Sequence, residues 1–397
     1  MPECKTKCIK APMIFIENTE DLSAFCQKLA EKPFIAVDTE FIRERSFYPK
    51  LCLIQVAAEK MEGIIDPKAK GINLEPFFDL LQNDSVMKVF HACSQDVEIF
   101  FLLTGNVPKP LFDTQIAAMV CSMGDSVSYL TLCEKVLGVT VDKEQRFTDW
   151  SARPLSEKQL GYALNDVTYL RDAYPKIVAM LEEQGRTSWV SEEMAALSDP
   201  AAYEDDPESA WKRIKFHSSN CKSLSVLKEI AAWREREAIY SDKPRQWILK
   251  DEHLAEIANL QPLTIPELSH MRLLPPGFAR SRLAVSLLEA VQKGQHLSAK
   301  DRPEKPKNKG ISKSKKALVN VLSLLLNVKS HEFGVAAHLI ASADELIAIA
   351  EEDHPNVRAM EGWRYDIFGA DALLLKQGKL KIFYDANLGE IGIERLS

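Results

Sequence analysis

The chain has 397 residues, a hydrophobic fraction of 46%, a charged fraction of 27% and a formal net charge of −7. This length exceeds one ordinary domain, and the composition is that of a globular protein rather than a disordered or fibrous one. No apolar run approaches the ~18 residues that a membrane span needs, and the N-terminal MPECKTKCIKAP lacks the apolar core of a secretory signal. We therefore expect a cytoplasmic protein with no membrane association.

In chain order, the first half alternates strand-like and helix-like segments. Strand-like runs lie at 13–16, 34–41, 51–58, 63–67 and 87–92. Short turns would join the second, third and fourth of them into an antiparallel meander. Helical patterns occur at 20–30 and 73–83, and helical periodicity dominates from residue 95 to about residue 180. This order predicts a mixed α/β sheet with helices.

The second half reads as helical. The polar, Pro-containing YEDDPES (203–209) breaks the chain, and a Lys/Pro-rich tract at 296–314 has the composition of a solvated linker. Helical segments are expected at 223–239, 253–260, 281–294 and 316–352. The predicted division is an α/β domain at 1–204, a small all-α domain at 208–295, a basic linker at 296–314 and a second small all-α domain at 315–397.

Local charge departs from the total. Residues 211–245 hold nine Lys/Arg against four Asp/Glu, and residues 299–316 hold eight against two. Such basic stretches favour contact with an anionic polymer in the helical half. The eight cysteines include no CxxC pair. Cys4 and Cys8 find no second pair that would complete a zinc site, so we expect no zinc.

Asp38 and Glu40 interrupt the apolar strand FIAVDTEF (34–41). Residues i and i+2 of a strand point to one face, so the two carboxylates lie side by side. At about 4 Å they would repel by roughly 4 kcal/mol at an effective dielectric of 20. No residue of FIAVDTEF is a cation. A cation from outside the strand must therefore compensate the charge.

Three further residues could join this pair. Asp96 stands in the first turn of an expected helix, where the helix dipole alone would explain it. Tyr162 and Asp166 are spaced i and i+4, which places a phenol and a carboxylate on one helical face, although a surface pair would show the same spacing.

Oxygen ligands suit Mg²⁺ or Mn²⁺. Four carboxylates can hold two such ions for phosphodiester cleavage, one generating hydroxide and the other stabilising the leaving 3′ oxygen. With an unperturbed pKa of ~10, a tyrosine such as Tyr162 would orient the water rather than deprotonate it. Motifs for ATP hydrolysis, dinucleotide binding, zincin proteolysis and serine hydrolysis are missing from the sequence.

At this point the motifs match a known family. The chain resembles ribonuclease D, of the DEDD exonuclease superfamily and its tyrosine subclass. The three exonuclease motifs correspond to VDTEFIRERSFYPKLCLIQVA (37–57), HACSQDVEIF (91–100) and YALND (162–166). LFDTQIAAMV (111–120) and FTDWSARPLSEKQLGYA (147–163) match as well. Residues 211–294 resemble the helicase-and-RNase-D C-terminal (HRDC) domain, and 316–397 resemble its more variable second copy.

The resemblance implies a ribonuclease-H-like exonuclease core followed by two helical HRDC modules. It implies hydrolytic 3′→5′ removal of nucleotides as 5′-monophosphates from structured RNA, chiefly tRNA precursors. Asp38, Glu40, Asp96 and Asp166 would bind two divalent metal ions, with Tyr162 as the fifth catalytic residue. No nucleotide cofactor is implied.

Substrate contacts can be assigned to further residues. Thr39 and Phe41 are similar to residues that hold the terminal nucleotide in relatives, although Phe41 reads equally well as a core aromatic. A base could stack on Phe41 or Phe47. The helical modules would grip phosphates through Lys212, Arg213, Lys215, Arg234 and Arg236.

Two other functions stay open at this level. One is a DNA exonuclease of the repair type, since the same core also serves in DNA proofreading and repair. No residue in the sequence reads the 2′-hydroxyl unambiguously, so RNA and DNA substrates are not distinguished. A catalytically silent RNA-binding protein is disfavoured, since all five active-site residues are present. Self-contained domains make a monomer the expected state.

Overall fold

The computed structural model describes residues 13–141, 148–216, 220–298, 300–303, 313–387 and 389–396. Cys4, Cys8 and most of the predicted basic linker lie outside these residues. The described residues group into two compact units. Unit 1 comprises those within 1–40, 51–203 and 310–397, and unit 2 comprises those within 41–50 and 204–309.

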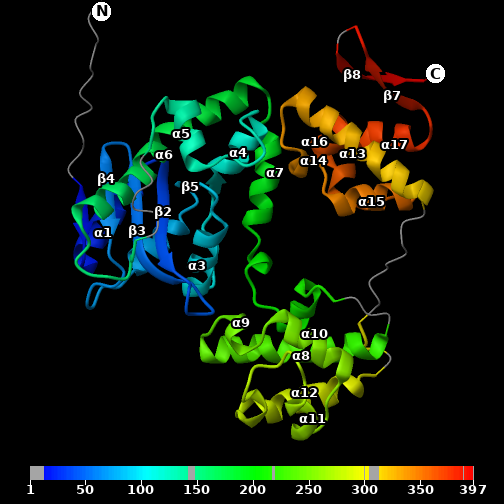
Figure 1. Ribbon diagram of the computed structural model, residues 1–397. Coiled ribbons are helices and arrows are strands. Elements are labelled where there is room, and N and C mark those ends of the chain that lie inside the picture. Colours follow the sequence, from blue (N-terminus) through cyan, green and yellow to red (C-terminus); the bar gives the residue numbers. More distant parts are fainter. Residues whose placement is uncertain are drawn as a thin grey trace, which may run out of the picture. The chain divides into compact units, whose positions relative to one another are not determined.

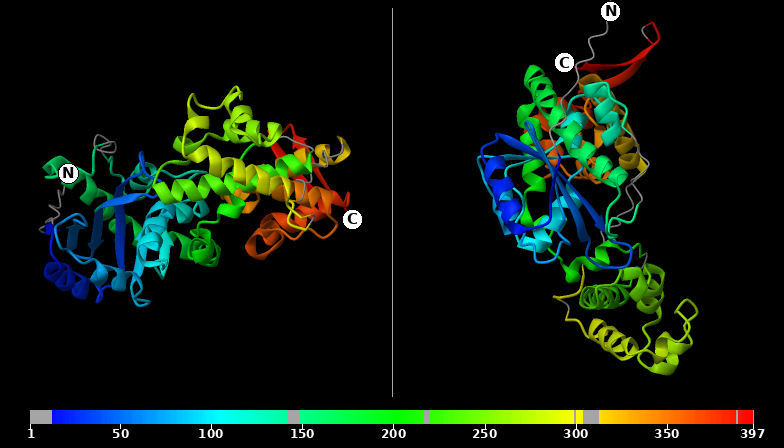
Figure 2. Two further views of the ribbon diagram at one scale, coloured as in Figure 1. Left: turned by 90° about the horizontal axis from the view of Figure 1, so that it is seen from below. Right: turned by 90° about the vertical axis from the view of Figure 1, so that its left-hand side faces the viewer.

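A six-stranded mixed sheet is the centre of unit 1, with helices packed around it (Figures 1 and 2). Its strand order is β1-β4-β3-β2-β5-β6. Strands β1 and β4, β2 and β5, and β5 and β6 pair in parallel, whereas β3 and β4 are antiparallel. The strands span Ile14–Ile16 (β1), Phe34–Ile42 (β2), Lys50–Ala58 (β3), Met61–Ile65 (β4), Met87–Phe90 (β5) and Leu111–Asp113 (β6).

Seven helices accompany this sheet in the described part of residues 13–203. They are α1 (Thr19–Leu29), α2 (Glu75–Leu81), α3 (Ser94–Thr104), α4 (Thr114–Val120), α5 (Tyr129–Leu137), α6 (Glu157–Glu183) and α7 (Thr187–Leu197), with a 3₁₀ turn at Pro200–Ala202. The predicted fold class of this half, a mixed sheet with helices, is confirmed.

The last part of the chain shares the hydrophobic core of unit 1. Leu322, Leu325 and Phe368 are fully buried in the same cluster as the strands. The elements are α13 (Lys313–Phe333), α14 (Ala337–Ile340), α15 (Ala343–Glu351), α16 (Gly362–Arg364), α17 (Ala370–Lys376), β7 (Leu380–Asp385) and β8 (Glu390–Arg395), with a 3₁₀ turn at Arg358–Met360 and a π-helical turn at Tyr365–Gly369.

This part is helical as predicted, with one addition. β7 and β8 form an antiparallel hairpin after the last helix. The resemblance predicted only helices for 316–397, and GWRYDIFGADALLLKQGKL (362–380) ends where β7 begins. The boundaries predicted at 204, 295 and 315 stay predictions, although 315–397 groups with the sheet domain rather than standing alone.

Unit 2 is helical and has its own core, which includes Leu227, Ile230, Leu254 and Leu287. Its elements are a 3₁₀ helix (Pro207–Arg213), α8 (Cys221–Ser241), α9 (Arg245–Ile248), α10 (Asp251–Leu260), α11 (Ile265–Ser269), a 3₁₀ turn (Phe278–Arg280) and α12 (Leu283–Gln295). Across the described residues of both units, no helix combines the length and apolar character needed to span a membrane.

Candidate active site

Strand β2 carries the two carboxylates that the sequence singled out. The alternating side chains Ile35 and Val37 are fully buried in the core. Asp38 and Glu40 are only partly buried and line a pocket. The strand thus keeps its apolar residues in the core and presents its carboxylates to an opening.

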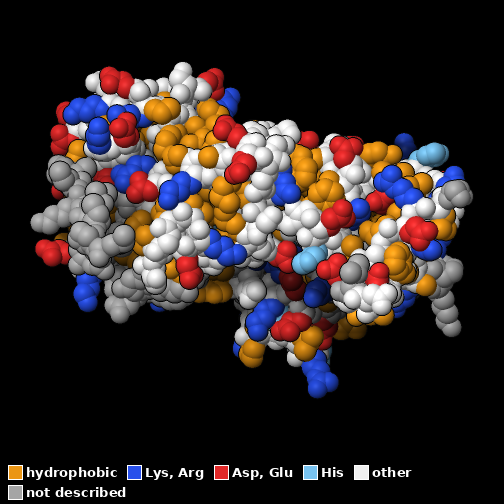
Figure 3. All heavy atoms as spheres, turned by 90° about the horizontal axis from the view of Figure 1, so that it is seen from above, with side chains coloured by type: hydrophobic (Ala, Val, Ile, Leu, Met, Phe, Trp, Pro, Cys, Tyr) orange, Lys and Arg blue, Asp and Glu red, His pale blue; other side chains and the backbone are white. Residues whose placement is uncertain are grey.

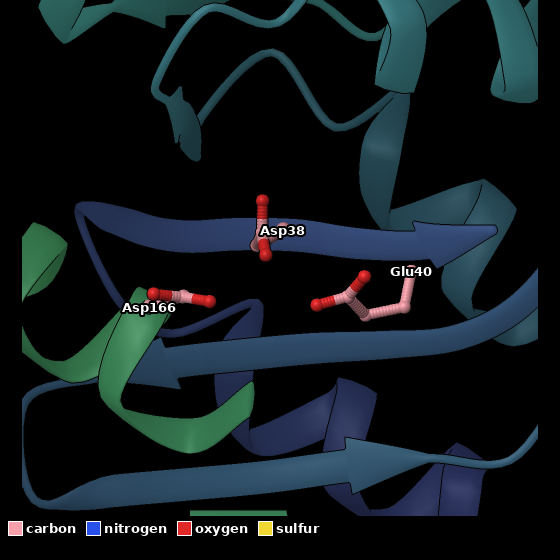
Figure 4. Close-up of side chains that lie close together, drawn as sticks. All are labelled: Asp38, Glu40 and Asp166. Carbon is pink, nitrogen blue, oxygen red and sulfur yellow. The ribbon is translucent and has the colours of Figure 1, made fainter. Parts of the chain in front are cut away.

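Helix α6 brings the third carboxylate. Ser156 caps its start in a capping box with Gln159, and Ala163, Val167 and Leu170 bury one face. Asp166 meets Asp38 and Glu40 so that one carboxylate oxygen of each lies within 4.8 Å of the others. Figure 4 shows the three side chains converging from β2 and α6 on one space.

Asp96 lies in the first turn of α3 and is 7% exposed. It is not one of the three converging carboxylates, but its charge acts on Glu40 and that of Asp38 acts on it. The Thr39 hydroxyl donates a hydrogen bond to Asp96 Oδ1. Thr39, predicted to hold a nucleotide, therefore fixes a carboxylate of the site, although it also lines the pocket.

Burial weakens the acidity of all four carboxyl groups, and repulsion by neighbouring carboxylates adds to it for Asp38, Glu40 and Asp96. Burial, then the charges of Asp38, Asp166 and Asp96, raises the pKa of Glu40 to about 10. Burial raises the pKa of Asp166 to about 7. Burial also raises the pKa values of Asp38 and Asp96 well above the usual range, with Asp166 adding to the first and Asp38 to the second. The fully charged cluster needs a compensating cation.

A pocket of about 420 Å³ opens over this cluster. Tyr162 reaches it from α6, one turn before Asp166, as the i and i+4 spacing predicted. The pocket is lined by Asp38, Thr39, Glu40, His91, Ala92, Gln115, Ser126, Ser128, Tyr129, Leu130, Val141, Tyr162, Asp166 and Leu170. A small polar group can thus meet carboxylates and a phenol in one place.

The donor set fits hard divalent cations. Asp38, Glu40 and Asp166 offer only carboxylate oxygens, which Mg²⁺ and Mn²⁺ prefer. A bound cation would also offset the repulsion that raises these pKa values. The residues present therefore fit a metal centre.

The two aromatic residues that were predicted to stack on a base lie in different surroundings. Phe41 is half-buried and does not line the pocket. Phe47 is 3% exposed in the core of unit 2, where the Arg245 guanidinium carbon lies 4.4 Å from the ring centroid. The prediction that Phe47 stacks on a base is wrong, because both the core and Arg245 cover its ring.

Four of the five predicted phosphate contacts are exposed in unit 2. Lys215 is exposed, Lys212 donates to Ser209, and Arg213 and Arg236 pair with Glu235 and Glu208. On the face drawn in Figure 3, basic and acidic side chains are interspersed.

Arg234 differs from these four. It is 4% exposed and donates to Asp251 at 2.7 Å and to the Leu249 carbonyl at 2.9 Å. Its guanidinium is held inside unit 2 by these two bonds. The structure therefore gives Arg234 a role in folding rather than in phosphate contact.

One residue that supports the site was not singled out from the sequence. Asp113 accepts hydrogen bonds from the backbone amides of Ala92, Cys93 and Gln115, at 3.0, 2.8 and 2.7 Å. It thereby fixes the turn before α3, where Ala92 has a φ of 59°. In the sequence, the resemblance of LFDTQIAAMV (111–120) to the exonuclease family was the observation that could have pointed to Asp113.

Comparisons with known proteins agree with this geometry. The profile of a 3′-5′ exonuclease family matches residues 13–182, and the HRDC domain profile matches residues 223–291. Ribonuclease D of Acidiphilium cryptum is 45% identical over 369 residues, which cover 93% of this chain and 94% of that protein. Ribonuclease D of Granulibacter bethesdensis is 44% identical over 371 residues, with the same two coverages.

One solved structure matches most of the chain. The crystal structure of Escherichia coli RNase D, described as an exoribonuclease involved in structured RNA processing, superimposes with a TM-score of 0.80 and 29% sequence identity. The match covers 92% of this chain and 99% of that one.

Proposed function

Because the chain belongs to the ribonuclease D family, and hence to the 3′→5′ exoribonucleases, we propose that it trims the 3′ ends of structured RNA, chiefly tRNA precursors. The hydrolysis would use two metal ions. The observation that carries the proposal is the convergence of Asp38, Glu40 and Asp166 within 4.8 Å in an open pocket. The products would be 5′-monophosphates and a shortened RNA with a new 3′-hydroxyl.

Membership of this family implies divalent metal ions, and we assign them to Asp38, Glu40, Asp166 and Asp96. When bound, two Mg²⁺ or Mn²⁺ ions supply a hydroxide nucleophile and stabilise the leaving 3′ oxygen. Thr39 supports this assignment by holding the Asp96 carboxylate with its hydroxyl.

The protein's own residues would orient the reaction. Tyr162 lines the pocket beside Asp166, so its phenol can hydrogen-bond the water that attacks the last phosphodiester. The water oxygen bonds to phosphorus, the bond to the 3′ oxygen breaks, and that oxygen takes a proton. A tyrosine is a weak base near neutrality, which favours positioning of the water.

Unit 2 would supply the grip on folded RNA. Lys212, Arg213, Lys215 and Arg236 are exposed, and lysine and arginine neutralise phosphates without reading sequence. The HRDC profile matches this unit as well. The monomeric state stays a prediction.

The test is incubation with a 3′-extended tRNA, with and without EDTA, and with matched single-stranded RNA and DNA oligomers. We expect 5′-mononucleotides from the RNAs, lost with EDTA and in Asp38→Asn. Release of longer fragments, or EDTA-insensitive cleavage, would contradict the mechanism. Faster digestion of DNA than of RNA would favour a repair exonuclease.

A further inference from the structure

The segment that leads into α6 is tied to the sheet by an ion pair whose carboxylate is buried and whose guanidinium is partly exposed. Asp66, directly after β4, is 3% exposed. Arg153 meets it with two bonds, Nε to Oδ2 at 2.6 Å and Nη2 to Oδ1 at 2.7 Å. Nη2 also donates to the Cys52 carbonyl in β3 at 2.7 Å. Such a two-pronged pair fixes both position and orientation.

The opposite side of the same guanidinium holds the backbone of this segment. Arg153 Nη1 donates to the carbonyls of Trp150 and Ala152, at 2.9 and 2.8 Å. Lys68 Nζ donates to the intervening carbonyl of Ser151 at 2.6 Å. Arg153 and Lys68 thus hold the three consecutive backbone carbonyls of residues 150–152, and these bonds fix the backbone at Trp150.

The Trp150 side chain packs beside the active-site phenol. It is 3% exposed, and its ring centroid lies 6.2 Å from that of Tyr162, with the planes inclined by 37°. Its buried indole N–H has no hydrogen-bond partner among the described residues. Burying an unpaired donor is unfavourable, so Trp150→Phe should keep the fold while it leaves an aromatic ring beside Tyr162.

We propose that Trp150 is a positioning residue for Tyr162. The Asp66–Arg153 pair fixes the indole, and the indole restricts the rotation of the phenol ring so that its hydroxyl stays over the carboxylate cluster. The inference rests on the proposed function, in which Tyr162 orients the attacking water. It adds that the phenol is held from outside the pocket, by a segment anchored at β3 and β4.

A misplacement of about 1 Å can cost roughly 100-fold in rate, because the reacting groups lose their alignment. The test compares Trp150→Ala and Trp150→Phe on a single-stranded RNA oligomer. We expect Trp150→Ala to lower kcat by roughly 10- to 100-fold, with KM changed by less than about twofold. Trp150→Phe, which keeps an aromatic ring, should restore most of kcat.

The decisive arm is a double-mutant cycle with Tyr162→Phe, which keeps the ring and removes the hydroxyl. If the indole acts through that hydroxyl, Trp150→Ala causes no further loss in the Tyr162→Phe background. Equal loss in both backgrounds, or failure of Trp150→Phe to rescue, would overturn the inference. If Trp150→Ala does not fold, Arg153→Lys replaces it in the same cycle, since lysine cannot make the two-pronged bond.

Trp189→Ala is the matched control, because Trp189 packs on Trp363 and Arg186 in the same unit and does not line the pocket. It should lower the thermal midpoint and leave kcat unchanged. A kcat loss equal to that of Trp150→Ala would mean that general loosening, not positioning, is measured. The proposed function itself fails on a separate result, namely a wild-type protein that releases no mononucleotide.

Discussion

At the scale of single residues, the active site combines like charges that the fold does not neutralise. Asp38, Glu40 and Asp166 meet within 4.8 Å, and no side-chain cation lines their pocket among the described residues. Two carboxylates about 4 Å apart repel by roughly 4 kcal/mol at an effective dielectric of 20. Without metal, the cluster therefore retains protons that ordinary carboxyl groups have lost.

This gives a pH dependence of stability. The pKa of Asp166 is about 7 in the folded protein, against about 3.9 in an unfolded chain. Between these values the folded state binds a proton that the unfolded state does not, so the free energy of unfolding falls as pH rises. The stabilisation that comes from this bound proton is complete below the pKa of the unfolded chain and is lost as pH rises above the folded pKa of about 7.

The measurement is thermal unfolding in EDTA at pH 5.5 and pH 8.0 for the wild type and Asp166→Asn. Because asparagine does not titrate, we expect a smaller fall in melting temperature for the variant. Manganese should restore wild-type stability at the higher pH, since the cation binds the ionised carboxylates. Equal falls in both proteins would show that Asp166 titrates normally.

Thr39 gives a second test at this scale. Its hydroxyl is the donor that holds Asp96, and groups that orient a metal ligand are typically worth 10- to 100-fold in metal affinity. We expect Thr39→Val to weaken Mn²⁺ binding by roughly that factor, and Thr39→Ser to retain affinity close to that of the wild type. Calorimetric titration with Mn²⁺ measures the affinity of each variant. Unchanged affinity in the valine variant would return Thr39 to the nucleotide-contact role.

The sequence revealed these residues unevenly, for a physical reason. Asp38 and Glu40 follow from the period of one strand, and Tyr162 with Asp166 from one turn of one helix. Trp150 and the Arg153 ion pair were not assigned roles, because their contacts are tertiary: Arg153 and Asp66 are 87 positions apart. No local period marks such a contact.

At the scale of elements, α7 joins the sheet domain to the C-terminal helices of unit 1. Arg364 is buried and donates to Glu192 at 3.1 Å and to the Leu339 carbonyl at 2.8 Å, and it also pairs with Glu193. Trp189 stacks on Trp363 with centroids 4.5 Å apart. These contacts bind α7 firmly to the last part of the chain.

Removing the arginine should therefore destabilise unit 1. Arg364→Met leaves the buried Glu193 without its closest cation, and we expect a loss of about 3–5 kcal/mol in the free energy of unfolding. Glu192→Gln is the control, because Glu192 is 46% exposed and Arg364 keeps its pairing with Glu193 in this variant, so we expect a loss of about 1 kcal/mol or less. Urea unfolding compares the two, and similar losses would contradict the role of Arg364.

Helices α8 and α12 of unit 2 meet at a glycine. A Cβ at Gly294 would lie 2.5 Å from Val226 Cα, so Gly294→Ala forces the helices apart, at a cost of about 1–3 kcal/mol. Gly161 in α6 has nothing within 4 Å of such an atom, and alanine there should be neutral or stabilising. Urea unfolding of both variants separates close packing from helix propensity; a stable Gly294→Ala protein would refute the close approach.

Sequence periodicity located most elements but not their grouping. The helical segments predicted at 223–239 and 281–294 became α8 and α12; α12 buries one face, whereas α8 is buried on nearly all sides. The hairpin β7–β8 was missed because residues 316–397 were assigned as a whole to a helical module, although the alternation in EIGIER is typical of a strand. Which helices share a core depends on side chains far apart in the chain, so the union of 315–397 with the sheet domain could not be read from local patterns.

At the scale of the whole molecule, the two units have different relations to catalysis. The converging carboxylates and the described residues of 313–396 belong to unit 1, and the exposed basic residues of 208–295 belong to unit 2. A chain that ends at residue 309 would lose Leu322, Leu325 and Phe368 from the core of unit 1. We expect that truncation to aggregate or melt at a much lower temperature than the full chain, as differential scanning fluorimetry would show.

The opposite deletion tests the proposed division of labour. Replacing 204–309 by a flexible Gly/Ser linker removes the helices of unit 2 and leaves only its segment 41–50. In that segment, Phe47→Ser replaces the aromatic ring that loss of the unit 2 core would leave exposed. This variant should digest short single-stranded RNA at the wild-type kcat, because the pocket and its carboxylates stay in place. On a 3′-extended tRNA it should bind more weakly, and the slope of log affinity against log salt should fall by roughly 0.7–0.9 per lost phosphate contact. An unchanged slope would place the RNA grip in unit 1 and refute the role of Lys212, Arg213, Lys215 and Arg236.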